Sequence, residues 1–481
     1  MEAAAHLPAN CSPNGWPSRR FWLCACGIVV AAFATRMAAA VWWQSRLELP
    51  TSFAFADSET YWSLAGTIYR DEPFQYGSPD ASVFRTPGYP ALLAIVFAIA
   101  GSDNPPVIFA RGLSAACGAA ATAFVIALGT RWRSPTVGLI TGLIAAFHPE
   151  AVSLGVFVLS EAPFHPLMVL NVWCFHEAFA VAGSSHKRRR WWSGFAAGVT
   201  AGLAALMRPS WLLFPPFLMG LKLAFIGFDL VATRLRGGRR PDADQDAPHV
   251  HDRRRTNVAL AWRSVSEVAR TGVPIILGVC LVMAPWWWRN YRVVGEFVPT
   301  TLQVGASLYD GWRPDAAGGS DMRFAPRFFD ELKREDALRS SPLPGTFESR
   351  LDRRQREAAV AWAGANPGRV IELIGIKFAR MWSPMPNSRD MGGVLLRAVI
   401  AIGFIPLMLL AAWQTWHCRR EWPTAWLLWA PAVYLTCLHT IFVSSLRYRQ
   451  PALLPLMALA AAAIVEAVAR WLQSAWRSRH G

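Results

Sequence analysis

Long apolar segments, each bordered by clusters of Lys and Arg, constrain the fold of this chain more than any other feature. Hydrophobic residues make up 53% of the 481 residues and charged residues only 17%, unlike an ordinary soluble domain. A run of about 20 apolar residues can cross the hydrocarbon core of a bilayer as a helix, and a helix satisfies its own backbone hydrogen bonds in lipid. The sequence therefore predicts an all-α polytopic membrane protein.

The basic clusters set the expected topology, because Lys and Arg are enriched on the cytoplasmic side of membrane proteins. We place these clusters on that side: residues 19–20, 131–133, 186–190, 234–263, 419–420 and 470–479. The apolar segments between them must then cross in pairs, with both termini inside. About ten transmembrane helices follow, at 21–43, 106–130, 136–148, 163–182, 192–207, 209–233, 271–288, 393–414, 423–444 and 451–472.

Some apolar segments need separate treatment. At about 1.5 Å per residue, a helix over residues 89–101 is shorter than the roughly 30 Å hydrocarbon core, and counting it as a crossing would move every later basic cluster outside. We interpret it as re-entrant or as lying at the outer surface. Segment 136–148 is equally short, but the pairing of the crossings requires it. The first span, 21–43, is too long for a signal-peptide core and lacks a cleavage-like end, so we expect it to be retained.

The spans divide the chain into four parts. These are a cytoplasmic N-terminal tail at 1–20, an N-terminal transmembrane module at 21–288, a large outer loop at 289–392 and a C-terminal transmembrane module at 393–481. The N-terminal module contains a first outer loop at 44–105 and a basic cytoplasmic loop at 234–263, whose Pro, Gly, Asp and Arg content predicts disorder. We expect the outer loops to carry juxtamembrane helices, such as one over 347–365.

The net charge of +16 would suggest a nucleic-acid partner in a soluble protein. Here most Arg clusters adjoin apolar spans, where they set the orientation of the helices in the membrane. We therefore expect no nucleic-acid binding.

A group of charged side chains falls at or near the predicted outer ends of the spans. Its members are Asp57, Glu59, Arg85, Glu161, Arg208, Arg289, Arg380, Arg447 and Arg449. Arg on this side runs against the inside bias and suggests a local anion such as phosphate. The alternative for each Arg is that it snorkels to lipid headgroups or caps the last carbonyls of a helix.

Asp57 has two interpretations that the sequence leaves open. It precedes a plausible helix, and Asp is a favoured N-cap residue; it is also a carboxylate placed just outside a bilayer, where it can serve as a base. On a helix Asp57 and Tyr61 share a face, so the tyrosine hydroxyl could orient the carboxylate or a sugar. Ser160 or Glu161 could likewise cap the helix expected near Pro163.

Six short motifs occur in a fixed order along the chain. They are Asp57-x-x-x-Tyr61, Arg85-Thr86-Pro87-Gly88-Tyr89-Pro90, Leu159-Ser160-Glu161, Leu206-Met207-Arg208-Pro209, Ala284-Pro285-Trp286-Trp287-Trp288-Arg289-Asn290-Tyr291-Arg292 and Arg447-Tyr448-Arg449-Gln450-Pro451. Together they resemble the GT-C membrane glycosyltransferases, and more closely the bacterial branch related to protein O-mannosyltransferases and lipid A aminoarabinose transferases. The resemblance runs from about residue 20 to about residue 470.

The resemblance implies a GT-C-like helical bundle whose first outer loop carries the catalytic aspartate, with a polyprenyl-phosphate-linked sugar as donor. Asp57 falls on that aspartate and Tyr61 on the nearby aromatic residue. Arg85 stands where relatives place a basic residue near the donor phosphate. Relatives often have adjacent Asp and Glu, whereas here Ser58 separates Asp57 from Glu59, which leaves the role of Glu59 open.

The residue types fit this chemistry independently. Transfer to a hydroxyl needs a base for the acceptor proton and charge stabilisation for the departing phosphate, and a single carboxylate opposite the leaving group gives inversion. We predict an inverting hexosyl- or pentosyltransferase that moves a sugar from a polyprenyl-phosphate donor to a hydroxyl of a glycolipid, polysaccharide or protein. The predicted catalytic residue is Asp57. The predicted substrate-binding residues are Glu59, Tyr61, Arg85, Tyr89, Glu161, Arg208, Arg289, Arg447 and Arg449.

No cofactor is predicted, because no cluster of His or acidic residues with ligand spacing occurs on the outer side. A divalent cation at Asp57 and Glu161 stays open. The expected location is a bacterial inner membrane, with the site facing the periplasm or the outside. The alternative function is a transporter or flippase of a lipid-linked sugar, although no matching pair of Gly/Pro-interrupted spans occurs in two halves. A scaffold for an envelope assembly is a third reading, in which Asp57 would be dispensable.

Overall fold

The structure is a computed structural model that describes residues 18–47, 53, 55–180, 187–237, 249–341, 343–386, 393–419 and 422–480. Every regular element in this part of the chain is a helix, which confirms the all-α prediction. The helices are α1 (Arg19–Gln44), α2 (Ala56–Tyr69), α3 (Gly88–Ala100), α4 (Val107–Trp132), α5 (Pro135–Phe147), α6 (Pro149–Leu154), α7 (Glu161–Ala180), α8 (Lys187–Met207), α9 (Phe214–Gly237), α10 (His249–Val294), α11 (Val304–Gly311), α12 (Ala325–Ala337), α13 (Phe347–Ala365), α14 (Pro367–Met381), α15 (Val394–His417), α16 (Trp422–Ile441) and α17 (Leu446–His480).

Six segments of these helices are long and apolar enough to cross a membrane: Arg19–Gln44, Val107–Trp132, Pro209–Phe228, Val268–Val294, Val394–His417 and Leu446–Arg479. The chain is a multi-pass membrane protein. Each of the ten predicted spans coincides with a helix, but α5, α7, α8 and α16 do not meet this criterion of length and composition. The number of crossings beyond six stays a prediction.

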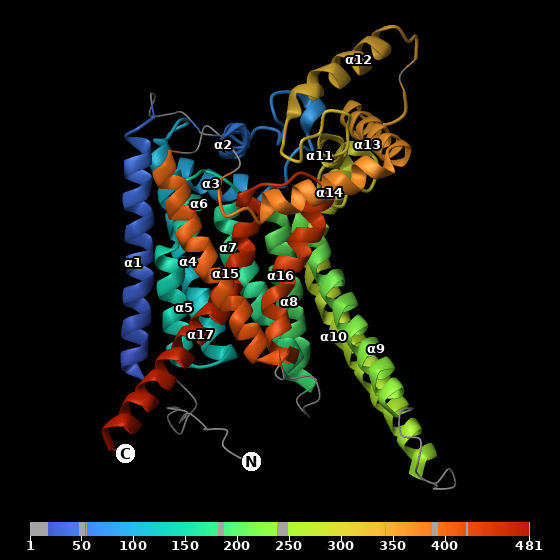
Figure 1. Ribbon diagram of the computed structural model, residues 1–481. Helices are drawn as coiled ribbons and strands as arrows, with labels where there is room; N and C mark the ends of the chain where they lie inside the picture. Colours follow the sequence, from blue (N-terminus) through green and yellow to red (C-terminus); the bar gives the residue numbers. More distant parts are fainter. Residues whose placement is uncertain are drawn as a thin grey trace. The chain divides into compact units, whose positions relative to one another are not determined.

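Contacts divide the chain into two compact units. The first comprises Met1–Val169, Leu206–Pro209 and Trp286–Gly481, and the second comprises Leu170–Ala205 and Ser210–Pro285. Within the first unit, α1 packs against α4 and α5, and α17 packs against α15 and α16. Figure 1 shows α2, α3 and α11–α14 gathered at one end of this unit, which we call the loop end, while α1 begins and α17 ends at the opposite end.

Small residues let the helices of the first unit approach closely, as is common between membrane helices. A Cβ atom on Gly138 of α5 would stand 2.6 Å from the carbonyl oxygen of Ile126 in α4, and one on Gly142 would stand 2.4 Å from the Ile126 side chain. Glycine at both positions is therefore needed for the α4–α5 contact. In α17 the run of alanines at 460–463 is almost fully buried, so this helix forms part of the core.

Two buried arginines fix the segment that leads to Glu161. Arg36 of α1 donates from Nη2 to the carbonyl oxygen of Ala145 (2.9 Å), near the end of α5, where carbonyls lack partners within the helix. Arg111 of α4 donates from Nη1 to the carbonyl oxygen of Val156 (2.8 Å). Residues 145–156 are thus held against α1 and α4, and the start of α7 follows directly.

Segment 89–101 forms most of α3, which packs against α2. Both helices lie at the loop end of the first unit (Figure 1), and α3 is shorter than a membrane-crossing helix. Whether it re-enters the membrane or lies at its surface stays a prediction.

The disorder expected over 234–263 is wrong at both ends of that segment. Helix α9 continues to Gly237 and α10 begins at His249, while residues 238–248 lie outside the described residues. The polar composition of this segment therefore did not end the helices where disorder was expected. The predicted tail at 1–20 also lies outside the described residues up to residue 17.

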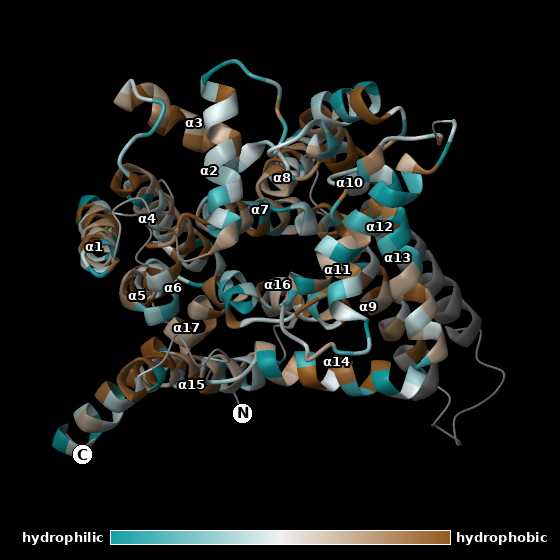
Figure 2. Cartoon of the chain, turned by 90° about the horizontal axis from the view of Figure 1, so that it is seen from above, coloured by the Kyte–Doolittle hydropathy of each residue, from teal (hydrophilic) through white to brown (hydrophobic). Residues whose placement is uncertain are grey.

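Four helices, α11–α14, occupy much of the predicted outer loop at 289–392. The helix expected over 347–365 is α13. Seen from above, α12 and α13 carry long hydrophilic stretches, whereas α14 alternates hydrophobic and hydrophilic residues (Figure 2). Ile371 and Phe378 of α14 are exposed and Lys377 is buried, as expected for a helix that lies along a membrane surface with its apolar face in the lipid boundary.

The second unit has its own polar core. The side-chain amide of Asn171 donates to the carbonyl oxygen of Ala197 (2.7 Å) and accepts from the indole of Trp211 (3.0 Å). A cavity of about 650 Å³ lies between α7 and α8, lined by Leu170, Trp173, Cys174, Glu177, Arg188, Arg189, Trp192, Ser193 and Ala196. None of the predicted site residues lines this cavity.

Candidate active site

Asp57 lies in the first turn of α2 and is not its N-cap. The N-cap residue is Phe55, in extended conformation and with no side-chain capping bond. Both carboxylate oxygens of Asp57 instead face arginines: Oδ1 lies 2.7 Å from Arg85 Nη2 and Oδ2 lies 2.8 Å from Arg447 Nη2. The capping interpretation is therefore wrong, and the carboxylate is committed to an ion-pair network.

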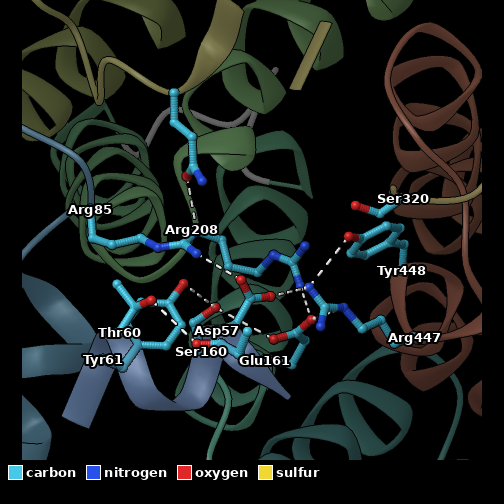
Figure 3. A network of polar contacts seen from close by, with 12 residues as sticks. Asp57, Thr60, Tyr61, Arg85, Ser160, Glu161, Arg208, Ser320, Arg447 and Tyr448 are labelled. Atoms are coloured by element: carbon cyan, nitrogen blue, oxygen red, sulfur yellow. Dashed lines mark hydrogen bonds and ion pairs between the residues drawn. The ribbon is translucent and has the colours of Figure 1, made fainter. Parts of the chain in front are cut away.

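The network continues from Arg447 to a second carboxylate. Arg447 Nε lies 3.0 Å from Glu161 Oε1, and Arg208 Nη1 lies 2.7 Å from the same oxygen. Three guanidinium groups thus alternate with two carboxylates, as the dashed lines of Figure 3 show. We call Asp57, Arg85, Glu161, Arg208 and Arg447 the central network; its formal charge is +1, which one singly charged anion would neutralise.

Segments from across the first unit bring these residues together. Arg85 comes from the irregular segment before α3, Glu161 begins α7, and Arg447 lies in the first turn of α17. Arg208 follows α8 in the segment that belongs to the first unit. A Cβ atom at Gly88 would stand 2.6 Å from the carbonyl oxygen of Leu206, so glycine at this position lets the Arg208 segment approach the start of α3.

Tyrosine side chains form one wall of the central network. The Tyr61 hydroxyl donates to Ser160 Oγ (3.2 Å), and Ser160 donates in turn to Glu161 Oε2 (3.4 Å). The ring of Tyr61 lies beside the Arg85 guanidinium, at 5.1 Å, and Tyr89 packs edge-on against it, also at 5.1 Å. Tyr61 therefore braces Arg85 and Ser160. Its hydroxyl hydrogen-bonds Ser160 and not Asp57, while the alternative contact with a sugar stays a prediction.

Two further residues that contact the central network were not predicted from the sequence. Arg85 Nη1 donates to Gln303 Oε1 (2.9 Å), and Arg447 Nη2 donates to the hydroxyl of Tyr448 (3.3 Å). The Tyr448 ring stacks on His439 with 4.1 Å between ring centroids. Tyr448 directly follows Arg447 in one of the six motifs, so its place in the site could have been predicted. Gln303 lies 218 residues from Arg85, and no local sequence feature indicated it.

Charge dominates the protonation of Asp57. Burial favours the neutral acid, but Arg85 and Arg447 outweigh burial and lower the pKa of Asp57 to about 2. The carboxylate is therefore ionised at neutral pH and is held as a partner of two arginines.

Arg449 does not join the central network, although it was predicted to bind substrate. Its Nη2 lies 2.5 Å from Glu150 Oε1, and its Nη1 donates to the carbonyl oxygens of Met381 and Ser383. The guanidinium also lies over the ring of Phe404, at 3.7 Å. Every direction around this fully buried side chain is occupied, so Arg449 acts as a structural lock.

Arg289 and Glu59 also lie apart from the central network. Arg289 donates to the carbonyl oxygens of Ser82 (2.6 Å) and Phe74 (2.9 Å), which belong to the first loop. Glu59 is exposed on α2, two residues beyond Asp57 and on a different face of the helix. The structure thus gives Arg289 a role in holding the loop and places Glu59 outside the predicted site.

No group of three or more His, Cys, Asp or Glu side chains is placed to hold a metal ion within the described part of the chain. The two carboxylates that could have shared a cation, Asp57 and Glu161, have the guanidinium of Arg447 between them. The site can therefore bind an anion on its arginines and offer one partly exposed carboxylate, Asp57, beside that anion.

The family described as dolichyl-phosphate-mannose-protein mannosyltransferase matches residues 84–233, less than half of the chain. This segment includes Arg85, Glu161 and Arg208 of the central network. No curated protein matches the sequence.

Solved structures with a related fold include the apo oligosaccharyltransferase of Archaeoglobus fulgidus, which is 16% identical with a TM-score of 0.52 and covers 95% of this chain and 52% of its own. The chain thus spans about half the length of that enzyme. ArnT of Cupriavidus metallidurans bound to undecaprenyl phosphate is 15% identical with a TM-score of 0.35 and covers 92% of this chain and 78% of its own. The similarity to the archaeal structure confirms the predicted GT-C-like fold.

Proposed function

We propose that this protein is an inverting glycosyltransferase that moves a sugar from a polyprenyl-phosphate donor to a hydroxyl acceptor. The observation that carries the proposal is the central network, in which three arginines alternate with two carboxylates and one of these, Asp57, is partly exposed. The family match over 84–233 supports a lipid-phosphate-linked sugar as donor.

The arginines suit the charge of such a donor. A sugar linked to polyprenyl phosphate is a phosphodiester with one negative charge, equal and opposite to the +1 of the central network. The side chains of Arg85, Arg447 and Asp57 are all partly exposed. A guanidinium binds phosphate oxygens as readily as carboxylate oxygens. A donor phosphate can therefore replace Asp57 as their partner.

This exchange also explains how Asp57 becomes a base. With a pKa of about 2, the paired carboxylate holds a proton too weakly to remove one from a hydroxyl efficiently. When Arg85 and Arg447 turn toward the phosphate, the two groups that lower this pKa are withdrawn and the basicity of Asp57 rises. Donor binding and activation of the base are then one event.

The reaction follows from these positions. The acceptor oxygen attacks the anomeric carbon, the bond from that carbon to the phosphate oxygen breaks, and the acceptor proton passes to Asp57. The polyprenyl phosphate leaves with one more negative charge than it had in the donor, and the arginines stabilise this charge. Because a single base acts opposite the leaving group, the product has the inverted anomeric configuration.

The experiment that tests the function uses purified protein in detergent with a panel of labelled polyprenyl-phosphate hexoses and pentoses and candidate hydroxyl acceptors. We expect transfer from at least one donor, with the inverted linkage seen by NMR. Donor movement across liposome membranes without any transfer would instead favour the flippase alternative. The same panel distinguishes a hexosyl- from a pentosyltransferase and identifies the acceptor.

We further propose that the reaction proceeds without a resident divalent cation, because Arg447 stands between the two carboxylates that would share one. Transfer should persist after EDTA treatment, whereas loss of transfer that is restored by Mg²⁺ or Mn²⁺ would contradict this.

For location, we propose a bacterial inner membrane with the loop end outside. A Glu59→Cys variant should react with a membrane-impermeant maleimide in intact spheroplasts, and protection until lysis would reverse the orientation.

A further inference from the structure

The peptide group between Ser82 and Val83 is held from two sides by charged side chains. Glu348 of α13 accepts hydrogen bonds from the backbone N–H of Ser82 (2.9 Å) and of Val83 (3.0 Å) on the same oxygen, Oε2. Arg289 of α10 donates to the carbonyl oxygen of Ser82 (2.6 Å) and to that of Phe74 (2.9 Å). Three polar groups of two consecutive residues are thus bound by one carboxylate and one guanidinium.

This contact lies two residues before Arg85 of the central network. The carbonyl oxygen of Val83 accepts from the backbone N–H of Leu302 (3.0 Å), and the next residue, Gln303, accepts from Arg85 itself. Val83 is fully buried. The backbone just before Arg85 is therefore anchored by residues from the second half of the chain.

The anchoring residues are themselves rigidly placed. Glu348 lies in the first turn of α13, whose N-cap Thr346 accepts from the backbone N–H of Ser349. Asp352, one turn further on, accepts from the backbone N–H of Gly305 in α11 (2.6 Å). A Cβ atom at Gly305 would stand 1.9 Å from the carbonyl oxygen of Asp352, so α11 and α13 are in close backbone contact.

We propose that Glu348 and Arg289 are positioning residues that hold the Ser82–Val83 backbone so that Arg85 reaches the donor phosphate, and that ionisation of Glu348 regulates this hold. The proposal rests on the proposed function for its effect on the donor, but the hold itself can be measured without any transfer reaction.

The environment of Glu348 makes this hold sensitive to pH. Burial, together with the nearby Asp352, raises the pKa of Glu348 to about 7 against the opposing effect of the Val83 and Ser82 N–H groups and of Arg289. In the turn before Ser82, Asp80 pairs with Lys333 of α12 (3.7 Å). Above pH 7 the carboxylate is ionised and accepts both N–H groups.

Below pH 7 Glu348 takes up a proton. A neutral carboxyl accepts hydrogen bonds more weakly than a carboxylate, and one of its oxygens becomes a donor that faces N–H groups. The hold on Ser82 and Val83 therefore weakens as the pH falls through 7, and the KM for the donor should rise over the same range.

The first test is backbone amide exchange of residues 74–87 in the unliganded wild-type protein between pH 6 and pH 8, corrected for the intrinsic pH dependence of exchange. We expect protection of Ser82 and Val83 to fall below pH 7 in the wild type and in the matched control Glu335→Gln, whose carboxylate pairs at the surface with Arg354. In Glu348→Gln protection should be lower and independent of pH. Equal protection at both pH values in the wild type would overturn the proposal.

The second test uses transfer kinetics. A lost hydrogen bond to a charged group corresponds to roughly tenfold in an equilibrium constant, so Glu348→Gln should raise the KM for the donor about tenfold at pH 8 and leave kcat within about twofold. The difference from wild type should shrink at pH 6. An unchanged KM would overturn the effect on Arg85, whereas absence of transfer in the wild type would count against the proposed function and leave the exchange result as the test of the hold.

Discussion

Arg447 and Arg449 lie two residues apart at the start of α17, and each pairs with a distant carboxylate, yet the two pairs differ in kind. The Arg447 side chain is 22% exposed and its partner Asp57 is 32% exposed. Arg449 is 0% exposed, its partner Glu150 is 7% exposed, and backbone carbonyls and Phe404 complete its surroundings. A ligand can take the place of Asp57 beside Arg447, whereas nothing can enter beside Arg449.

This difference indicates when a paired arginine can bind a ligand. Its carboxylate partner must be partly exposed, and backbone carbonyls must not already occupy the rest of the guanidinium. A buried and saturated pair contributes to a defined arrangement of helices instead, and breaking it leaves an uncompensated charge. Substitutions should separate the two pairs, because the proposed function assigns transfer to the Arg447 pair and the burial of the Arg449 pair assigns it to stability.

The largest effect is expected at the buried Arg449–Glu150 pair. Glu150→Gln removes the carboxylate from a fully buried Arg449 and should lower the free energy of unfolding by about 3–5 kcal/mol, measured by thermal and denaturant unfolding in detergent. The control Glu335→Gln breaks a half-exposed surface pair and should leave stability within measurement error. Equal stability of the two variants would show that the Arg449 pair is not a lock.

The next largest effect is expected at the partly exposed Arg447–Asp57 pair. Arg447→Gln removes a donor to the phosphate in the transition state and should lower kcat/KM by roughly 10²–10³-fold, with a thermal midpoint close to that of the wild type. Arg477→Gln, on the exposed far end of the same helix, is the matched control for transfer. If Arg447→Gln instead failed to fold, Arg447 would be a structural residue like Arg449.

A smaller effect is expected at Gln303, which accepts a hydrogen bond from Arg85. Gln303→Ala leaves Arg85 without its amide acceptor, at a cost of about 1 kcal/mol, and should raise the KM for the donor roughly fivefold while kcat changes little. The exposed Gln473 provides the control, as Gln473→Ala. A change in kcat with constant KM would mean that Gln303 acts on the chemical step and not on the placement of Arg85.

Much of the fold was predictable because it depends on local properties of the sequence. Hydropathy and the basic clusters placed a helix at each predicted span, since apolar length and charge position are properties of a segment by itself. The helices α11, α12 and α14 were not placed individually, because the segments between 289 and 392 are amphipathic and short and their apolar faces are visible only once a packing partner is known.

The site was predictable in part. The motifs brought together Asp57, Arg85, Glu161, Arg208 and Arg447, which the structure joins in one network. They could not separate Arg447 from Arg449, because residues two apart on a helix point in different directions and the environment in each direction comes from other helices. For the same reason Glu150, in a sequence context without partners, gave no sign of its pairing with Arg449 across 299 residues.

Asp57→Asn tests the proposed role of Asp57 most directly when donor binding and transfer are measured side by side, with Glu59→Gln as the matched control on the same helix. The variant removes the negative charge that competes with the donor phosphate for Arg85 and Arg447. We expect Asp57→Asn to bind the donor at least as tightly as the wild type but to transfer sugar roughly 10²–10⁴-fold more slowly, while Glu59→Gln behaves as the wild type. Normal transfer by Asp57→Asn, or loss of donor binding together with transfer, would contradict the role of Asp57 as a base released by the donor.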